Sequence, residues 1–185
     1  MDNGAEYYEA YAGGDDSAMY DLVREYRDGM IMFIRGTVGD VHRAEEICED
    51  VFFDLAVKKP KYAQKYSFRT WLYTLCRNKT VDYIRREAGR ATLSADEIAE
   101  SVADGEVLER EYLKSEQRIA LYRALGELSE DHRTVLMLSA IEGLPNAETA
   151  AVMGKTKRQV ENLLYRAKSA LRIELEKEGF VYEEL

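Results

Sequence analysis

The stretch AETAAVMGKTKRQVENLLYRAK, residues 147–168, predicts two helices joined by a tight turn. A helix-turn-helix needs a small residue where the helices cross, a glycine in the left-handed turn and a branched residue that anchors the second helix. Ala150, Gly154 and Val160 occupy these places at spacings of four and six residues. Thr156 and Gln159 form a T-x-x-Q capping box at the start of the second helix. The stretch therefore predicts a helix-turn-helix.

The second helix of this motif begins with basic and amide side chains. Residues 155–172 carry six basic residues against Glu161 as the one acid. Lys157, Arg158, Gln159 and Asn162 lie near the helix start, where recognition residues reach base edges in the major groove. The pattern favours a reader of duplex DNA, and an ordinary helical hairpin is the alternative.

The rest of the chain also has the pattern of helices. It contains two prolines, and apolar residues recur at i, i+3, i+4 and i+7 in many stretches. Ser129 precedes two acids as an N-cap, while Gly143 and Gly154 are natural C-terminal stops. Helices are expected near residues 16–36, 40–57, 67–88, 108–125, 130–142, 146–153 and 157–176.

The stretch ATLSADEIAESVADGEVLERE, residues 91–111, is polar, acidic and weakly periodic. Such a segment is typical of a linker between domains. The predicted fold is all-α, with two small helical domains joined by a flexible acidic linker and a helix-turn-helix in the C-terminal domain. The expected boundaries are 1–90, 91–117 for the linker, and 118–185.

The formal net charge is −9, but the charge is distributed in blocks. Residues 1–60 carry fourteen acidic residues against six basic ones, whereas residues 61–90 carry eight basic residues against two acidic ones. A polyanion responds to the local field rather than to the total charge. An acidic total therefore does not exclude a nucleic-acid partner.

The basic block contains the stretch YSFRTWLYTLCRNKTVDYIRRE, residues 66–87, which mixes arginines with aromatic rings. Arg69, Tyr73 and Arg77 are spaced by four and are expected to share an outward ridge, opposite a core-facing stripe of Phe68, Trp71, Leu72 and Leu75. A solvated amphipathic helix is the ordinary reading of such a pattern. The functional reading is a surface for single-stranded DNA, where cations meet phosphates and rings stack on bases.

Catalytic and metal-binding patterns do not stand out. His42 and His132 lie far apart without ligand spacing, and no Gly-rich phosphate loop precedes a Lys-Ser or Lys-Thr pair. Cys48 and Cys76 lack CxxC spacing and are expected to be small buried hydrophobes. We expect no enzyme activity, no catalytic residue, no metal and no cofactor. No stretch has the pattern of a signal peptide or a membrane span, so we expect a cytoplasmic protein without membrane insertion.

Three motifs in order carry a family resemblance: AEEICEDVFFDLA (44–56), FRTWLYTLCRNKTVDYIRR (68–86) and LSEDHRTVLMLSAIEGLPNAETAAVMGKTKRQVENLLYRAKSALR (128–172). They resemble the polymerase-docking helix, the promoter-melting and −10-reading helix, and the −35-reading domain of bacterial RNA polymerase sigma factors. The chain thus resembles the sigma-70 family, in its extracytoplasmic-function (ECF) subfamily. The resemblance implies a region 2-like domain at 1–90 and a region 4-like domain at 118–185.

The resemblance also implies partners and site residues. The partners would be core RNA polymerase, promoter DNA as duplex and as melted strand, and an anti-sigma factor. Polymerase would contact Glu45, Glu46, Glu49 and Asp50, with Val51 and Phe52 supporting that helix from the core. The −10 strand would contact Lys61, Tyr62, Lys65, Tyr66, Arg69, Tyr73, Arg77 and Asn78. The −35 duplex would contact Lys155, Thr156, Lys157, Arg158, Gln159, Asn162 and Arg166.

Some positions depart from the family pattern. Pro145 stands where a serine often opens the first helix of the motif, so Asn146 is expected to cap it instead. Glu161 and Leu163 replace basic residues of the recognition helix. A one-component helix-turn-helix regulator is the alternative function, but it would leave the 44–56 helix and the 66–87 block unused.

Overall fold

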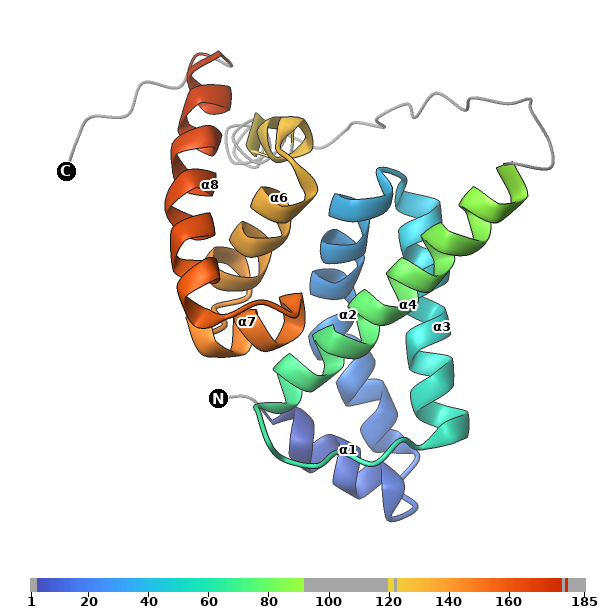
Figure 1. Cartoon of the computed structure of the whole chain (residues 1–185). Helices are drawn as coiled ribbons and strands as arrows, with labels where there is room; N and C mark the ends of the chain where they lie inside the picture. Colours follow the sequence, from blue (N-terminus) through green and yellow to red (C-terminus); the bar gives the residue numbers. More distant parts are fainter. Residues whose placement is uncertain (1–2, 92–119, 122, 178, 180–185) are drawn as a thin grey trace, which may run out of the picture.

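The structure is a computed structural model that describes residues 3–91, 120–121, 123–177 and 179. Within these ranges it contains helices and turns and no strand, so the predicted all-α class is confirmed. The helices are α1 (Gly4–Ala12), α2 (Ser17–Val38), α3 (Val41–Lys58), α4 (Phe68–Ala91), α6 (Glu130–Leu136), η1 (Met137–Ile141), α7 (Asn146–Met153) and α8 (Lys157–Lys177) (Figure 1).

Most predicted helix boundaries agree with the structure to within a few residues. The helix expected at 130–142 divides into α6 and the π-helical segment η1. Helix α1 was not predicted from the sequence. Residues 120, 121 and 123–127 are helical. The acidic linker and most of the helix expected at 108–125 lie outside the described residues, so those predictions and the domain boundaries stay predictions.

Helix α1 forms because tyrosines give it a tertiary anchor. The Tyr8 ring is buried, and its centroid lies 5.6 Å from that of Phe68 and 5.3 Å from that of Trp71. Its hydroxyl donates to the Pro60 carbonyl at 2.7 Å. A buried tyrosine needs such a partner for its hydroxyl, and that partner comes from a distant segment. Local periodicity therefore gives little sign of α1.

Helices α2, α3 and α4 build the N-terminal core above α1. Fully buried side chains from all three helices meet there, including Leu22, Ile47 and Leu72. The Asp40 side chain caps α3 by accepting from the Arg43 backbone N–H at 2.9 Å. That hydrogen bond lowers the pKa of the Asp40 carboxyl.

The C-terminal helices form the predicted helix-turn-helix. Ala150 and Val160 are buried between α7 and α8, and Gly154 adopts the left-handed turn at φ 65°. The capping box is present: the Thr156 N–H donates to Gln159 Oε1 at 2.8 Å, and the Gln159 N–H donates to Thr156 Oγ1 at 3.2 Å. Sequence spacing alone was sufficient to predict this motif.

Two helix starts differ from the expected caps. Ser129 stands at the N-cap of α6, but its side chain makes no capping hydrogen bond. Helix α7 begins at Asn146 with Pro145 at the N-cap position and no side-chain cap, so the expectation that Asn146 caps it is wrong. Proline fixes φ near the value of an extended entry into the helix, and the Pro145 carbonyl accepts from the Glu148 and Thr149 N–H groups at 2.9 Å each.

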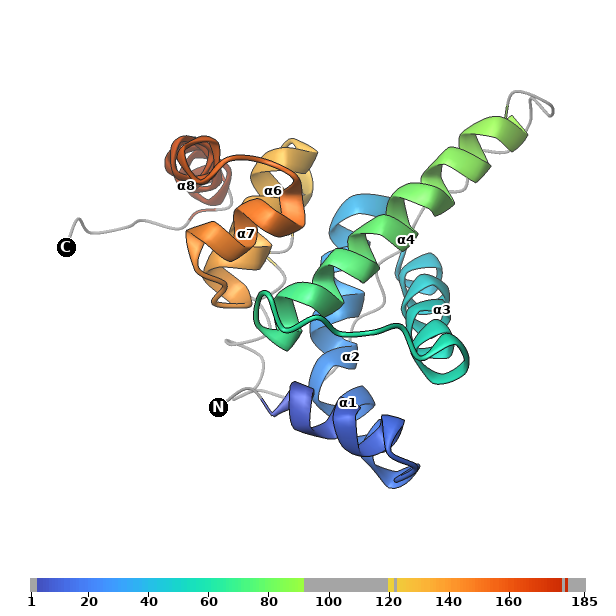
Figure 2. The same cartoon turned by 60° about the horizontal axis from the view of Figure 1, so that its bottom comes forward.

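The two helical groups pack directly against each other. Helix α4 contacts α7, and α2 contacts α6 (Figure 2). Buried residues of both groups belong to one contiguous hydrophobic cluster that contains, for example, Phe33 and Tyr73 of the first group with Val135 and Leu138 of the second. The sequence predicted two helical domains, but it gave no sign that they meet.

Candidate nucleic-acid interface

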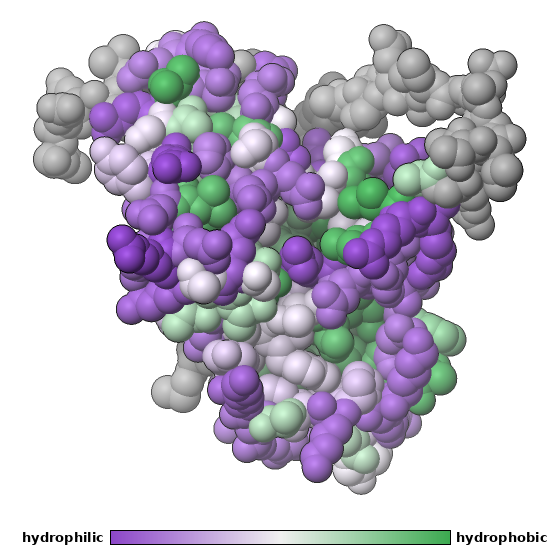
Figure 3. All heavy atoms as spheres, in the orientation of Figure 1, coloured by the Kyte–Doolittle hydropathy of each residue, from purple (hydrophilic) through white to green (hydrophobic). Residues whose placement is uncertain are grey.

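The segment that precedes α4 presents cations and an aromatic ring to solvent. Lys61, Lys65 and Tyr66 are exposed, and the Lys65 ammonium lies 5.4 Å from the centroid of the Tyr66 ring. Asn78, further along α4, is exposed as well. Figure 3 shows mainly hydrophilic side chains along α4 and α8, with small and separate apolar patches. This composition suits a polyanion rather than an apolar ligand.

Helix α1 holds this segment in a defined shape. Lys59 and Gln64 have left-handed backbone conformations, with φ of 42° and 52°. The Lys59 ammonium lies 4.5 Å from the centroid of the Tyr11 ring, and the Gln64 amide donates to Glu9 at 2.7 Å. Unusual backbone conformations that neighbours hold in place are typical of binding segments. The segment is thus preorganised rather than a plain spacer.

Tyr62 contributes to this shape more than to the exposed surface. Its ring is half-buried and packs edge-on against Phe68, with centroids 5.4 Å apart, and beside Trp71 at 5.3 Å. Its hydroxyl donates to the Tyr66 carbonyl at 2.5 Å. The structure therefore places Tyr62 beneath Tyr66 as a support.

Tyr73 does not lie on an outward ridge, so that sequence prediction is wrong. The side chain is fully buried and packs edge-on against Phe33 with centroids 5.3 Å apart. Burial, together with the negative charge of Glu142, raises the pKa of its hydroxyl. Helix α4 packs against α2 and α3 on one side and α7 on another, so its buried arc is wider than one amphipathic stripe.

The two arginines of the predicted ridge face the C-terminal helices. The Arg69 guanidinium lies 3.5 Å from the Glu142 carboxylate and donates to the Glu142 carbonyl at 3.2 Å. It also lies over the Tyr26 ring, 5.4 Å from its centroid. Arg77 lines a small cavity with Glu130 and Thr134 of α6. Both arginines are partly buried in this arrangement.

The start of α8 is accessible, in contrast to the start of α4. Arg158, Asn162 and Arg166 are exposed, as the recognition-helix reading requires. Lys157 is also exposed and lies 3.7 Å from Glu161 one turn later. The ion pair joins Lys157, which is a predicted DNA contact, to Glu161, which stands where the family often has a basic residue.

Three other predicted duplex contacts have structural partners. The Lys155 ammonium lies 2.9 Å from Asp131 of α6. Thr156 and Gln159 hold each other in the capping box. Their side chains fix the beginning of α8, which sets the direction in which the exposed residues point.

Sequence reasoning missed Tyr165 on the same helix. Its side chain is 76% exposed and lies one turn after Glu161 and next to Arg166. An exposed aromatic ring among cations is a recognisable signal for a nucleic-acid surface. The tyrosine was overlooked because helical periodicity alone does not separate a half-buried position from an exposed one.

The acids of α3 form a second kind of surface. Glu46, Glu49 and Asp50 are not buried, while Val51 and Phe52 are buried beneath them as predicted. Glu45 is partly shielded, because it lies 3.4 Å from Arg27 and 3.8 Å from His42. The surface therefore rests mainly on the other three acids.

Two apolar residues continue this acidic stripe. Phe53 is 62% exposed and Val57 is 63% exposed. With Glu46 and Asp50 they follow spacings of four, three and four residues, which places all four on one face of α3. Large apolar side chains left on a surface beside charges are typical of a protein interface. We call Glu46, Glu49, Asp50, Phe53 and Val57 the α3 face.

Lys79 connects the α3 face to α4. Its ammonium lies 2.9 Å from Asp54 and 3.5 Å from Asp50. Burial opposes the charge on Lys79, but the hydrogen bond to Asp54 and the nearby Asp50 raise its pKa overall. Hydrogen bonds from Lys79 and Lys58 lower the pKa of Asp54. Lys79 thus acts mainly as a tie between two helices.

The two cysteines are buried, as the sequence reading expected. Burial raises the pKa of the Cys48 thiol to about 12 and that of Cys76 well above its usual value. Among the described residues no group of histidine, cysteine and carboxylate side chains is placed to hold a metal ion. No helix in this part of the chain is long and apolar enough to cross a bilayer.

Two family models match this chain. The one described as Sigma-70 region 2 matches residues 22–90, and the one described as Sigma-70, region 4 matches residues 118–171. The ECF RNA polymerase sigma factor SigW of Bacillus subtilis is 28% identical over 170 residues, which cover 88% of this chain and 91% of SigW.

Two solved structures share the fold. One is CnrH in complex with the cytosolic domain of CnrY, with 24% identity, a TM-score of 0.63, and coverage of 95% of this chain and 99% of that chain. The other is the sigma factor RpoE in complex with the anti-sigma factor NepR from Bartonella quintana. It has 21% identity, a TM-score of 0.67, and coverage of 84% of this chain and 97% of that chain.

Proposed function

The chain belongs to the sigma-70 family of bacterial RNA polymerase sigma factors, in its ECF group, and from this premise we propose how its surfaces divide the work of initiation. As a sigma factor it binds core RNA polymerase and directs transcription initiation at promoter DNA. The family is not an enzyme family, so bond formation belongs to the polymerase. One structural observation carries the proposal: the chain combines an exposed acidic face on α3 with two separate basic helices, α4 and α8.

The α3 face is the proposed polymerase contact. Its acids attract a basic partner and set the association rate, while Phe53 and Val57 supply apolar area that excludes water from the contact. A basic coiled coil of the large polymerase subunit fits this chemistry. Glu45 contributes less in this proposal because Arg27 and His42 already surround it.

The 61–66 segment with Arg69, Arg77 and Asn78 is the proposed site for the melted −10 strand. Lys61 and Lys65 steer phosphates, and Tyr66 offers a face on which an unstacked base can stack. Unpairing a base costs a few kcal/mol, which binding must offset. Tyr62 supports Tyr66 from below, and Tyr73 has no place in this contact because it lies in the core.

The start of α8 is the proposed reader of the −35 duplex. Lys157, Arg158, Asn162 and Arg166 form its exposed surface, and Tyr165 adds a ring that can contact a thymine methyl group. Lys155 contributes from the turn, and Thr156 and Gln159 orient the helix. Glu161 holds Lys157 and thereby tunes which phosphate that ammonium reaches.

Three further statements belong to the proposal. The chain acts in the cytoplasm, where the polymerase is. An anti-sigma factor controls it, in line with the relative RpoE, whose solved structure contains the anti-sigma factor NepR. The acids Asp96, Glu97, Glu100, Asp104, Glu106 and Glu109, which lie outside the described residues, act as a spacer that can also compete with the transcript for positive charge.

Run-off transcription tests the function directly. Purified core polymerase is given genomic fragments with and without the full chain, and discrete transcripts are expected only when the chain is present. A one-component regulator would bind DNA without core polymerase and would not produce new start sites with core alone. Transcripts that are identical with and without the chain would contradict the proposed function.

The docking contact has its own test. Glu46→Lys with Glu49→Lys should lower affinity for core polymerase at least tenfold, because it places two cations against a basic partner. Fluorescence anisotropy with labelled chain measures this affinity. Circular dichroism should stay unchanged, since exposed charge changes cost little stability. The matched control is Glu6→Lys with Glu176→Lys, which makes the same charge change at exposed positions on α1 and α8. Equal weakening in both variants would contradict a specific contact.

A further inference from the structure

Helix α1 holds the segment that connects α3 to the start of α4. The Tyr11 hydroxyl donates to the Ala56 carbonyl in the last turn of α3 at 3.1 Å, and the Tyr8 hydroxyl donates to Pro60. The segment runs past α1 before it enters α4 (Figure 1). The match to Sigma-70 region 2 begins at residue 22, so α1 lies before the matched part of the chain. The role of α1 therefore has to be inferred from its own contacts.

Two residues of the segment with an unfavourable backbone conformation are held by α1 through their side chains. Among the residues that the structure describes, Lys59 and Gln64 are the two non-glycine residues with a positive φ. The Lys59 ammonium lies over the Tyr11 ring, and the Gln64 amide donates to Glu9 at 2.7 Å. A Cβ disfavours this conformation, which persists where the surroundings fix it, commonly at binding sites. The fixed shape points to a binding role for Gln64.

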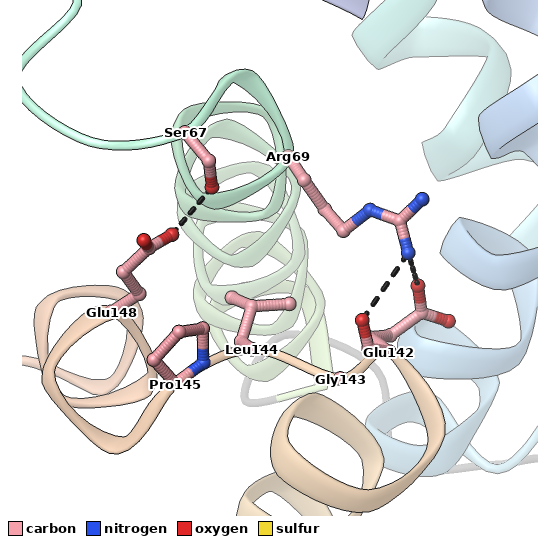
Figure 4. Close-up of a pocket in the computed structure, with 7 residues that line it drawn as sticks. All are labelled: Ser67, Arg69, Glu142, Gly143, Leu144, Pro145 and Glu148. Carbon is pink, nitrogen blue, oxygen red and sulfur yellow. Dashed lines mark hydrogen bonds and ion pairs between the residues drawn. The ribbon is translucent and has the colours of Figure 1, made fainter. Parts of the chain in front are cut away.

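The far end of the segment is fixed by α7 instead. Glu148 accepts hydrogen bonds from the hydroxyls of Ser67 and Thr70 at the start of α4 (Figure 4). Residues 63–66, which lie between the contacts with α1 and those with α7, are exposed. A strand can therefore reach the middle of the segment, where Gln64 lies.

The hydrogen bond between Gln64 and Glu9 fixes the direction of the amide. A carboxylate only accepts hydrogen bonds, so the amide nitrogen must face Glu9 and the carbonyl oxygen must face away from it. Both side chains are exposed. The pair therefore offers two acceptors to a ligand, which are the carbonyl oxygen of Gln64 and the second carboxylate oxygen of Glu9.

The bases of a melted strand differ in what they offer to such acceptors. Adenine, cytosine and guanine carry an exocyclic amino group that donates hydrogen bonds, whereas thymine carries carbonyl oxygens and no amino group. A hydrogen bond from an amino group to a carboxylate is stronger than one between neutral groups, while a thymine carbonyl would face a negative charge. A carboxylate also repels phosphate. Glu9 therefore lowers the affinity for every strand while it raises the difference between bases.

We propose that α1 belongs to the strand-binding site: Glu9 orients the Gln64 amide, and the pair selects a base with an exocyclic amino group over thymine. Gln64 contacts the base, and Glu9 is the positioning residue that also repels carbonyl oxygens. The inference rests on the proposed binding of the melted strand by the 61–66 segment, and it names the class of base that this site prefers.

Anisotropy with the full chain and short labelled single strands tests this preference. One strand contains only thymine, and the other carries a single central adenine in the same background. The parent should bind the adenine strand about tenfold more tightly, which is within the usual discrimination of a well-placed pair of hydrogen bonds. Cytosine or guanine at the same place should also be preferred over thymine. Equal affinity for all of these strands would overturn the proposal.

Variants of the pair separate base selection from simple anchoring. Gln64→Ala should abolish most of the difference between the adenine and thymine strands. Glu9→Gln should do the same and should bind the thymine strand more tightly, because it removes a negative charge and its amide nitrogen can donate to thymine carbonyls. Glu9→Gln with Gln64→Glu exchanges the two groups at unchanged net charge, allows the same hydrogen bond, and should restore the preference.

The matched control is Glu6→Gln, which removes another exposed carboxylate of α1 and should keep the preference of the parent. If Glu9 only anchored the segment, Glu9→Gln would weaken binding to both strands by the same factor. That result would overturn base selection, and an equal loss of preference in the control would assign it to net charge.

Run-off transcription supplies a second readout, from templates already mismatched across the −10 segment. Thymine in place of one non-template adenine should lower the transcript yield with the parent and should not lower it with Gln64→Ala. A yield that is insensitive to thymine at every such position with the parent would overturn the proposal. Absent transcripts from every template would instead contradict the proposed function, whereas the strand titration needs no polymerase and decides the inference by itself.

Discussion

Helices α4 and α8 both carry basic and aromatic residues, yet they differ in how much of their surface is exposed to solvent. Helix α8 packs through one stripe of Val160, Ala167 and Leu175 and leaves its opposite face in solvent. Helix α4 is packed by α2 and α3 on one side and by α7 on another. The same residue composition is therefore an accessible surface on one helix and a partly covered one on the other. Composition predicts which helices carry a basic surface, and packing decides how much of that surface is accessible.

The difference has an energetic counterpart. A substitution on the exposed face of α8 should leave the fold intact, because surface changes usually cost less than about 0.5 kcal/mol. On α4, buried positions such as Tyr73 stand close in sequence to exposed ones such as Asn78. A substitution there should therefore affect stability at one position and leave it unchanged at another. The predictions below test this contrast, beginning with the largest expected effect.

Two tyrosines of the α4 region give the sharpest contrast. Tyr73→Ala should lower the free energy of unfolding by about 3–5 kcal/mol, the range for truncating a buried aromatic side chain. Tyr66→Ala should change it by less than about 0.5 kcal/mol and should weaken binding to single-stranded DNA instead. Urea denaturation followed by circular dichroism measures the first effect. Equal stability of the two variants would mean that Tyr73 is a surface residue after all.

The exposed face of α8 should dominate duplex binding. Lys157→Ala with Arg158→Ala should weaken affinity for duplex promoter DNA about tenfold to a hundredfold. It should also reduce the slope of log affinity against log salt by about one unit for each phosphate that the variant no longer neutralises. Anisotropy titrations at several salt concentrations measure both quantities. Arg172→Ala with Lys177→Ala, toward the far end of the same helix, also removes two exposed cations and is the matched control. An identical weakening in the control would assign the effect to net charge.

The exposed and half-covered residues of α4 should act at strand opening. Arg77→Ala with Asn78→Ala should reduce transcription from a closed duplex promoter about tenfold, because binding then offsets less of the unpairing cost. Templates already mismatched across the −10 segment should restore most of the activity. The α8 variant should not be restored by such templates. Equal rescue of both variants, or normal permanganate reactivity of the opened strand in the α4 variant, would remove the distinction between the helices.

The smallest expected effect is on thermal stability, and it concerns the ion pair between Lys79 of α4 and Asp54 of α3. The pKa of Asp54 is lowered in the folded chain, so its charge contributes stability above the ordinary carboxyl pKa, and this contribution disappears as the pH falls through the lowered pKa. Asp54→Asn should therefore lower the melting temperature slightly at neutral pH. At a pH below the lowered pKa of Asp54 the carboxyl of the parent is protonated as well, so the substitution should no longer change the melting temperature. Thermal unfolding across this acidic range tests the sign. A difference in melting temperature between parent and variant that grows as the pH falls would contradict a stabilising Lys79–Asp54 ion pair.

The helix-turn-helix could be predicted from sequence because its determinants are local. Ala150, Gly154 and Val160 specify a crossing, a turn and an anchor within eleven residues, and the Thr156–Gln159 box lies within one turn. The buried stripe of α4 was predicted for the same reason. Tyr73 was not, because its burial depends on Phe33 of α2 and Glu142 of the C-terminal group.

Sequence by itself determined α2, α3, α4, α7 and α8, the two basic blocks and the acidic stretch of α3, since these follow from periodicity, caps and charge within short windows. Only the tertiary structure decided that α1 anchors the 61–66 segment, that Tyr73 lies in the core and that Glu142 and Glu148 meet α4. These contacts join residues far apart in the chain, and each depends on how two helices are oriented in space. Helix packing angles follow from the shapes of whole surfaces, which no local pattern encodes.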